Sequence, residues 1–296
     1  MMHAAIAIGS NSTRLLAARK QAGALTDIFR GREETRLFLG LDEQGNIRPE
    51  RLEETAQAVA RLAALARGRG ADSIALFATS ASRDAKNSDA LARRIYALTG
   101  LTLRIISGQE EARLGFLAAA GQARRMVMDI GGGSTELTLG EKGHVLWAES
   151  AQLGASRLLK EQPIACLADA QRARARAETL LRPFCQALQA YPPAPALIGL
   201  GGTCTTAAAM RLGREAHGET VEGLRLSRDF LQAQWTLLAE LPLEKRMQVP
   251  GLPPARAIHM PHGLSILLAA MALLHFDEIT VSARTNLDGF LLEQEE

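Results

Sequence analysis

Three segments rich in Gly, Ser and Thr are the first candidates for chemistry in this 296-residue sequence: GSNST (9–13), GGGST (131–135) and GGTCTT (201–206). Gly-rich turns of this kind direct several backbone N–H groups into one concavity, which suits an anion. Glycine also permits a close approach of phosphate that a side chain would block. A single such turn is weak evidence, because ordinary tight turns use the same residues. Three of them favour a phosphate site, with three ordinary turns as the alternative.

The first two segments belong to an internal repeat. AAIAIGSNSTRLL (4–16) and MVMDIGGGSTELTL (126–139) both begin with a short apolar strand, pass through Ile-Gly into the turn, and return to alternating apolar residues. An offset of 122 residues aligns the two turns and pairs Ala7 with Asp129. A period of this length indicates a duplicated domain rather than a solenoid.

Strand and helix patterns alternate on both sides of the repeat boundary. In the first half we expect a helix at 49–68, a strand at 73–81, a helix at 87–100, a strand at 101–107 and a helix at 108–121. In the second half we expect strands within 126–140, at 144–150 and at 196–202, a helix at 169–190, further helices to about 275, a strand at 278–283 and a short final helix. Such alternation in two similar halves predicts two α/β domains that face each other. We place the domains at 1–121 and 122–296.

Composition restricts the class of protein. The net charge of +2 gives no sign of a general nucleic-acid binder, although 29 of the 34 basic residues are Arg, whose fork suits phosphate oxygens. No apolar run approaches the ~18 residues that a membrane span needs. The N-terminal residues lack the basic leader and long apolar stretch of a signal peptide. We therefore predict a cytoplasmic protein without nucleic-acid or membrane partners.

The three cysteines, Cys166, Cys185 and Cys204, argue against a disulfide framework or a zinc site, because their number is odd and no two are close in sequence. Cys204 lies in the third Gly/Thr-rich segment, where a reactive thiolate is conceivable. A small buried thiol is the commoner case.

The complete set of segments resembles the exopolyphosphatase/guanosine pentaphosphate phosphohydrolase (Ppx/GppA) family. The matching segments cover almost the whole chain in the family's order: IGSNSTRLL (8–16), ATSASRDAKN (78–87), IISGQEEARLGF (105–116), MDIGGGSTEL (128–137), QLGASRL (152–158), IGLGGTCTTAAAM (198–210) and VSARTNLDGFLLE (281–293). The resemblance implies the short, two-domain form of the family. Its implied fold is α/β, with duplicated ribonuclease H-like domains of the actin-like ATPase (sugar kinase/Hsp70) superfamily facing across a cleft.

The resemblance also implies an activity. A member of this family is a phosphoric anhydride hydrolase that uses Mg²⁺ or another divalent cation. Its substrate is inorganic polyphosphate, from which it removes the terminal phosphate, or guanosine pentaphosphate, from which it removes the 5′ phosphate. The motifs are shared between these two activities. The resemblance leaves a homodimer open as well.

Individual roles follow from motif positions. The family's catalytic carboxylate falls on Glu111, which would act as the general base, and Arg83 would neutralise developing charge. Without the resemblance, Glu110 and Glu111 would read as first-turn acids that complement a helix dipole. Asp129 and Glu136 correspond to acids associated with the metal, and Arg157 and Arg256 are candidates for the path of a polyanion. The implied phosphate-binding residues are Gly9, Ser10, Asn11, Ser12, Arg14, Gly131, Gly132, Gly133, Ser134, Gly201, Gly202 and Thr203.

The chain departs from the family pattern at three places. Ala7 stands where the first turn of the family opens with Asp, and a methyl group cannot ligate Mg²⁺. Ile258 replaces an acid, and Leu287-Asp288 replaces Arg-Glu at the start of the final helix. Ala7 favours a further hypothesis, that of a weakly active or inactive sensor that binds polyphosphate or nucleotide. His259 and His262 have an i, i+3 spacing that could suit a metal, but histidines at a helix start explain them as well.

Overall fold

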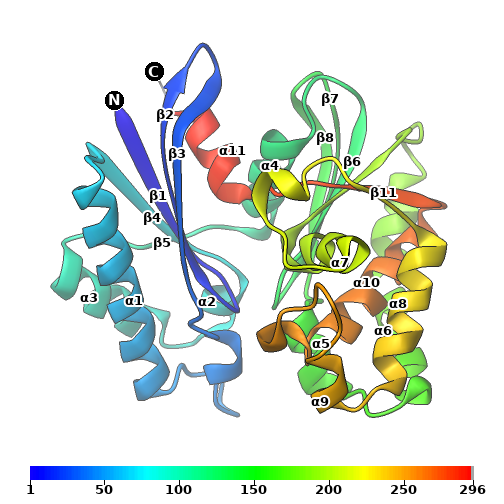
Figure 1. Cartoon of the computed structure of the whole chain (residues 1–296). Helices are drawn as coiled ribbons and strands as arrows, with labels where there is room; N and C mark the ends of the chain where they lie inside the picture. The colour runs from blue at the N-terminus through cyan, green and yellow to red at the C-terminus, as the bar shows by residue number, and fades with distance from the viewer. Residues whose placement is uncertain (295–296) are drawn as a thin grey trace. The chain divides into compact units, whose positions relative to one another are not determined.

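The structure is a computed structural model that describes residues 1–294. The chain forms two compact units, each with its own sheet (Figure 1). Unit 1 consists of Met1–Ala118 together with the segment that begins at Asn286, and unit 2 consists of Ala119–Thr285. The chain therefore passes from one unit to the other twice.

Unit 1 is built on one mixed sheet. Its strands are β1 (Met2–Ile8), β2 (Thr13–Gln21), β3 (Ala24–Glu33), β4 (Ser73–Ala78) and β5 (Arg104–Ile105). Its helices are η1 (Phe38–Gly40), α1 (Pro49–Gly68), α2 (Ser80–Asp84), α3 (Ser88–Thr99), α4 (Gly108–Ala119, which runs to the border of unit 2) and α11 (Asn286–Glu293). The strand order is β3-β2-β1-β4-β5, in which β1 to β3 form an antiparallel meander and β4 and β5 run parallel to β1.

Alternation along the strands gives this sheet two buried faces. One face of β1 and β2 packs against α1 and α3 through residues that include Ile6, Ile8 and Leu15. The alternate residues Ala5, Ala7 and Leu16 face the opposite side. There they form a second apolar cluster with residues of β4, α4 and α11: Phe77, Leu114, Leu287 and Leu291. Leu287 and Leu291 belong to α11, which contacts β1, β2 and β3 on the face away from α1 (Figure 1). The final helix is thus part of the core of unit 1.

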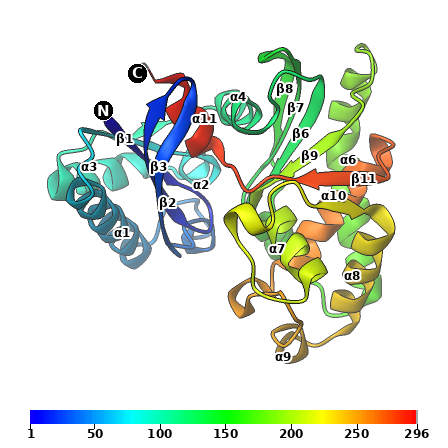
Figure 2. The ribbon, with the colours of Figure 1, turned by 45° about the horizontal axis from the view of Figure 1, so that its top comes forward.

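Unit 2 repeats the plan with additional helices. Its strands are β6 (Arg125–Ile130), β7 (Thr135–Glu141), β8 (His144–Ala151), β9 (Leu197–Leu200), β10 (Arg225–Ser227) and β11 (Glu278–Val281). Its helices are α5 (Ala155–Glu161), α6 (Leu167–Leu188), α7 (Gly201–Leu212), η2 (Gly218–Thr220), α8 (Arg228–Glu240), α9 (Leu243–Arg246), η3 (Pro254–Arg256) and α10 (Met260–Leu273). Helices α6, α8 and α10 pack together (Figure 2), and α10 is the most buried of them.

The two sheets share one topology. In unit 2 the order is β10-β11-β9-β6-β7-β8, so β8-β7-β6-β9-β11 reproduces β3-β2-β1-β4-β5, and β10 is an added antiparallel edge strand. A three-stranded meander extended by parallel strands, present twice in one chain, is the duplicated ribonuclease H-like fold of the actin-like ATPase superfamily. The predicted α/β fold class is confirmed.

The structure differs from the sequence-based expectations in four respects. The segment from Asn286, which we assigned to the second domain, belongs to unit 1 because its leucines complete that core. The strand expected at 101–107 is shorter, because β5 consists of Arg104–Ile105 alone, and the short strand β10 was not expected. The third Gly-rich segment, which we expected to be a turn at the end of the strand at 196–202, is the start of α7, which begins at Gly201. No helix in the described part of the chain is long and apolar enough to cross a membrane.

Candidate functional site

The predicted site residues collect at one edge of each sheet. In unit 1 the first Gly-rich turn follows β1, α2 follows β4, and the start of α4 follows β5. Because β1, β4 and β5 are parallel, these three connections lie at the carboxyl edge of the same sheet. In unit 2 the second turn, the start of α7 and the segment from Ser282 follow β6, β9 and β11 in the same way. This edge is where ligands bind in open α/β sheets.

The first two Gly-rich turns are built alike. The N–H of Gly9 donates to Ser12 O at 3.0 Å, and the N–H of Gly131 donates to Ser134 O at 2.9 Å. A Cβ added to either glycine would approach that same carbonyl to 3.1 Å, which explains why the turn tightens at glycine. The shared geometry confirms that the two segments are copies of one structural unit.

The second turn is held by α5. The carbonyl of Gly132 accepts from the N–H of Ser156 at 2.8 Å and of Arg157 at 3.0 Å. The Arg157 guanidinium donates to Gly133 O at 2.7 Å and to Gln152 Oε1 at 2.7 Å. Arg157, a candidate for the polyanion path, therefore positions the turn.

The third segment brings a carboxylate and a guanidinium to the first turn of α7. Gly201 has φ +82°, and a Cβ there would collide with Asp129 Oδ1 and lie 2.8 Å from Ile130 O. A Cβ on Gly202 would collide with the guanidinium of Arg256. Both glycines are required because these charged groups lie against the helix start. A carboxylate at this end of a helix is favoured by the helix dipole.

Thr203 has a different environment from the one its motif implied. The side chain is buried, and a Cβ on Gly263 of α10 would collide with its Oγ1. Thr203 thus forms the close contact between α7 and α10.

Asp129 and Glu136 are direct cross-strand partners on β6 and β7. Opposite residues in an antiparallel pair share a face, with Cβ atoms about 5 Å apart. Glu136 is buried, and its Oε1 accepts from Ser150 Oγ at 2.7 Å. Two like charges in this arrangement repel each other, and a divalent cation would relieve the repulsion.

The chemistry of this pair fits Mg²⁺. Hard carboxylate oxygens are its preferred protein ligands, and one or two of them suffice when water and substrate phosphates complete the shell. Across residues 1–294, no group of three or more His, Cys, Asp and Glu side chains is placed to hold a metal. The fit therefore rests on the Asp129–Glu136 pair rather than on a complete protein cage.

The same strand positions carry different groups in unit 1. Ala7 on β1 pairs with Arg14 on β2, and the offset of 122 residues aligns these two with Asp129 and Glu136. Where unit 2 has two carboxylates, unit 1 has a methyl group and a guanidinium. The Arg14 Nε donates to Ser12 Oγ at 3.3 Å, which holds this cation beside the first turn.

Glu111 and Arg83 form an ion pair at the start of α4. Arg83 Nη1 lies 2.9 Å from Glu111 Oε2 and 3.0 Å from Ile106 O, and the two side chains are only 17% and 11% exposed. Arg83 Nη2 is buried without a hydrogen-bond partner among the described residues. Glu110 instead forms an ion pair with Arg104, which is 56% exposed. The structure thus separates the adjacent acids and gives only Glu111 a shielded, oriented carboxylate.

The structure gives the surroundings of Cys204 and His262, two residues for which the sequence left alternatives. Cys204 is fully buried, and this burial raises the pKa of its thiol, with the charge of Asp129 raising it further. A reactive thiolate at this position is excluded. His262 Nε2 lies 2.9 Å from Gln162 O and its Nδ1 3.3 Å from Ile258 O, so both ring nitrogens face backbone carbonyls.

Comparison with known proteins decides the family. The model described as the Ppx/GppA phosphatase family matches residues 16–296. The chain belongs to this family. The resemblance seen in the motifs is confirmed, and this Ppx/GppA protein is a phosphatase. The first turn and Ala7 lie before the matched residues.

Related proteins match the chain along its length. It is 33% identical to Exopolyphosphatase 2 of Mycobacterium tuberculosis over 317 residues, covering 98% of this chain and 97% of the relative. The crystal structure of a Ppx/GppA family member from Aquifex aeolicus has a TM-score of 0.83 and 26% identity, and the match covers 99% of this chain and 96% of that chain. An exopolyphosphatase structure from Cytophaga hutchinsonii has a TM-score of 0.89, covering 98% of this chain and 96% of that chain, and at 22% identity it shows the fold alone.

Two arginines near the first turn were missed from the sequence. Arg32 on β3 pairs with Arg14 on β2, and the N–H of Arg36 donates to Asn11 O at 2.9 Å. Neither residue is part of a motif quoted above. The Ala22–Gly23 hairpin turn was the signal that could have shown β3 returning beside the first turn.

Proposed function

We propose that this chain is an exopolyphosphatase, which hydrolyses the terminal phosphate of inorganic polyphosphate with Mg²⁺. The observation that carries the proposal is the shielded carboxylate of Glu111, oriented by Arg83 at the start of α4, in a Ppx/GppA phosphatase. The relative named Exopolyphosphatase 2 supports inorganic polyphosphate as the substrate.

The proposed chemistry assigns one proton acceptor. A water molecule attacks the terminal phosphorus, and the P–O bond to the next phosphate breaks in line with the attack. Glu111 takes the proton of the attacking water, and the oxygen of the shortened chain leaves with the bond's electron pair. Arg83, which holds Glu111 in place, stabilises charge on the transferred group through its remaining N–H groups.

Unit 2 supplies further groups in this proposal. Asp129 and Glu136 would hold Mg²⁺, which neutralises phosphate oxygens when bound. The turn that contains Gly132, Gly133 and Ser134 and the start of α7 would bind phosphate oxygens through backbone N–H groups. Arg256, which lies against Gly202, brings a cation to the same helix start.

The test compares neighbouring acids. We expect Glu111→Gln and Glu111→Ala to reduce phosphate release from long-chain polyphosphate by about 10²–10⁴-fold, the usual worth of a general base. The matched control is Glu110→Gln, which removes an adjacent carboxylate that is paired with exposed Arg104, and it should retain activity. Polyphosphate binding, measured separately by calorimetry, should survive in all variants.

Two results would count against the proposal. Full activity in Glu111→Gln would remove the assigned base. No release by the wild-type protein, when it is folded and binds polyphosphate, would favour the binding or sensor hypothesis that Ala7 raised. Guanosine pentaphosphate would then be the next substrate to test.

A further inference from the structure

A row of cations crosses the meander of unit 1. Arg14 on β2 lies directly opposite Ala7 on one side and opposite Arg32 of β3 on the other. Opposite residues share a face of the sheet, so the two guanidinium-bearing side chains project together. Partial burial and, after it, the charge of Arg14 lower the pKa of Arg32. Like charges held side by side in this way are destabilising unless an anion lies near them.

A third arginine continues the row beside the first turn. Arg36 has φ +45°, a left-handed conformation that is strained for a residue with a side chain. Its N–H donates to Asn11 O at 2.9 Å, and the N–H of Phe38 donates to Ser10 O at 3.0 Å. These bonds hold the segment that follows β3 against the first Gly-rich turn and fix the strained backbone there.

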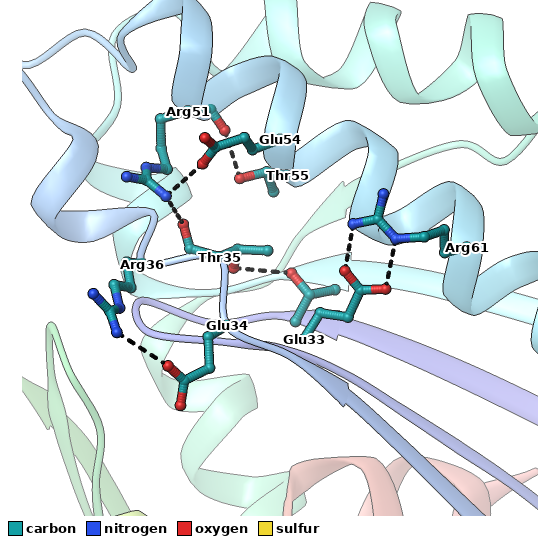
Figure 3. A network of polar contacts seen from close by, with 9 residues as sticks. Glu33, Glu34, Thr35, Arg36, Arg51, Glu54, Thr55 and Arg61 are labelled. Atoms are coloured by element: carbon teal, nitrogen blue, oxygen red, sulfur yellow. Dashed lines mark hydrogen bonds and ion pairs between the residues drawn. The ribbon is translucent and has the colours of Figure 1, made fainter. Parts of the chain in front are cut away.

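Buried contacts anchor the segment between Glu34 and Arg36 (Figure 3). Thr35 is buried, its hydroxyl lies 3.1 Å from that of Thr13, and its carbonyl accepts from Arg51 Nη1 at 3.2 Å. With Thr35 held inward, its two neighbours are displayed on a fixed backbone. An arrangement of this kind reduces the entropy lost when a ligand binds.

Glu34 is the carboxylate that pairs with both Arg32 and Arg36. Its oxygens lie 3.4 Å from Arg32 Nη2 and 3.2 Å from Arg36 Nη2, and all three side chains are 41–51% exposed. The preceding Glu33 belongs to the other face, where it pairs with Arg61 of α1 (Figure 3). Exposed ion pairs of this length contribute little to stability, so a phosphate can replace the carboxylate at low cost.

We infer that Arg14, Arg32 and Arg36 form a binding subsite for the chain of a linear polyphosphate beyond its reacting end. Arginine forks match phosphate oxygens, and successive cations across the meander match a ligand that carries charge at every phosphate. Glu34 occupies the subsite as an internal counter-ion until the polyanion displaces it. This inference rests on the proposed function, because it names the part of that same substrate which the row binds.

Binding measurements on matched variants test the subsite. Arg32→Gln and Arg36→Gln each remove one cation and keep the Cβ, and Arg61→Gln makes the same charge change on the opposite face. Affinity for long-chain polyphosphate and for tripolyphosphate is measured by calorimetry in EDTA over a range of salt concentrations. We expect Arg32→Gln and Arg36→Gln to weaken long-chain binding by about fivefold, the size of a half-exposed charge-assisted contact, and Arg61→Gln to leave it unchanged. Each subsite variant should also lower the salt slope by about 0.7.

Removal of the counter-ion Glu34 should change the affinity for long-chain polyphosphate in the opposite direction. Glu34→Gln should tighten long-chain binding by about two- to threefold, because the polyphosphate no longer has to displace a carboxylate from Arg32 and Arg36. Glu33→Gln is its matched control and should change nothing.

The outcomes separate this inference from the function on which it rests. Equal long-chain affinity in all three arginine variants would overturn the subsite while phosphate release by the wild-type protein still supported an exopolyphosphatase. A loss as large for tripolyphosphate as for the long chain would assign these arginines to the reacting end, which also overturns the subsite. A wild-type protein that neither binds polyphosphate nor releases phosphate from it would overturn both proposals.

Discussion

Ala7 is the residue at which the first repeat lacks a carboxylate that the second repeat has. Its counterpart Asp129 faces Glu136, whereas Ala7 faces Arg14. The position is buried at 5% exposure, so a carboxylate there would need a partner. Arg14 is already placed to provide one, which makes the missing acid restorable by a single substitution.

Ala7→Asp is therefore expected to fold and to bind Mg²⁺ more tightly than the wild-type protein. The added carboxylate supplies a hard oxygen ligand in unit 1, and Arg14 offsets part of its burial cost. The measurement is the Mg²⁺ dependence of both thermal stability and phosphate release. Ala7→Asn, which has the same shape without the charge, is the control. If both variants require the same Mg²⁺ concentration as the wild-type protein, Ala7 marks no missing ligand.

At the scale of single residues, the candidate site residues that could be predicted from the sequence are those that lie in a motif or in the repeat. The repeat alone identified Ala7 as the odd member of a pair, and the family pattern selected Glu111 over Glu110. Arg32 could not be found in this way, because its contact depends on the register between β2 and β3. A register shift between Ala17 and Arg19 alters that pairing by one residue, so counting back from the hairpin turn gives the wrong partner.

The element with the clearest structural explanation for a family departure is α11. Asp288 stands where the family pattern differs. Its buried carboxylate accepts hydrogen bonds from Nη2 and Nη1 of Arg30 on β3, at 2.5 and 3.1 Å. The next residue, Gly289, lies so close to Leu114 of α4 that an added Cβ would collide with its carbonyl oxygen. Asp288 and Gly289 thus fix the helix against β3 and α4.

Loss of the Asp288 carboxylate should loosen this helix. We expect Asp288→Ala to lower the free energy of unfolding by about 1–3 kcal/mol, because a buried charge-assisted pair is removed and Arg30 is left without it. Chemical denaturation gives the value. Glu293→Gln is the control, since it removes a more exposed ion pair, with Arg113, on the same helix. Equal stability of the two variants would show that the Asp288 pair does not hold α11.

Helix α10 carries a titratable group that predicts a pH effect. Burial lowers the pKa of His262 to about 4, below the ordinary value of 6.5. Between pH 6.5 and 4 the unfolded chain therefore binds a proton that the folded chain does not, and stability falls as pH falls through this window.

His262→Gln should remove this part of the pH dependence. The difference in unfolding free energy between pH 7.5 and 4.5 should shrink by up to about 3 kcal/mol relative to the wild-type protein. Urea denaturation at the two values is the measurement, and exposed His144 provides the control variant His144→Gln. An unchanged difference would mean that His262 is protonated in the folded protein as readily as in the unfolded one.

Long periodic elements were predicted well, and short ones poorly. The helix expected at 49–68 has those bounds in the structure, because its Pro start and Gly end are local signals. The strand expected at 101–107 was wrong over most of its length, because only Arg104 and Ile105 pair with β4. The helix expected at 87–100 begins one residue later, at Ser88, and Asn87 makes no cap bond, since its amide binds both backbone groups of Ile47. Tertiary contacts decided the extent of β5 and the role of Asn87.

At the scale of the whole molecule, unit 2 is inserted into the chain of unit 1. No local feature of the sequence indicates that the segment after Thr285 returns to the first sheet, because the apolar pattern of a helix does not show which sheet the helix packs against. The second apolar cluster of unit 1 depends on Leu287 and Leu291 of this returning segment.

A chain that ends at Thr285 should therefore lose order in unit 1 and keep unit 2 folded. Hydrogen exchange followed by mass spectrometry should show faster exchange in β1, β2 and β4, with β6, β7 and β9 unchanged. Leu287→Ala combined with Leu291→Ala tests the same packing in the full chain, at about 2–5 kcal/mol for each leucine. Equal acceleration in both sheets would show instead that the two units unfold together.

The path of the chain also determines the order in which the two units can fold during translation. Strands β1 to β5 leave the ribosome first, yet the helix that covers one of their faces is made only after all of unit 2. Unit 2 can close its core as soon as β11 has emerged, so the half translated second can be the first to finish folding. Throughout that interval the apolar face around Leu16 and Phe77 lacks α11, which makes the nascent first unit a natural client for chaperones.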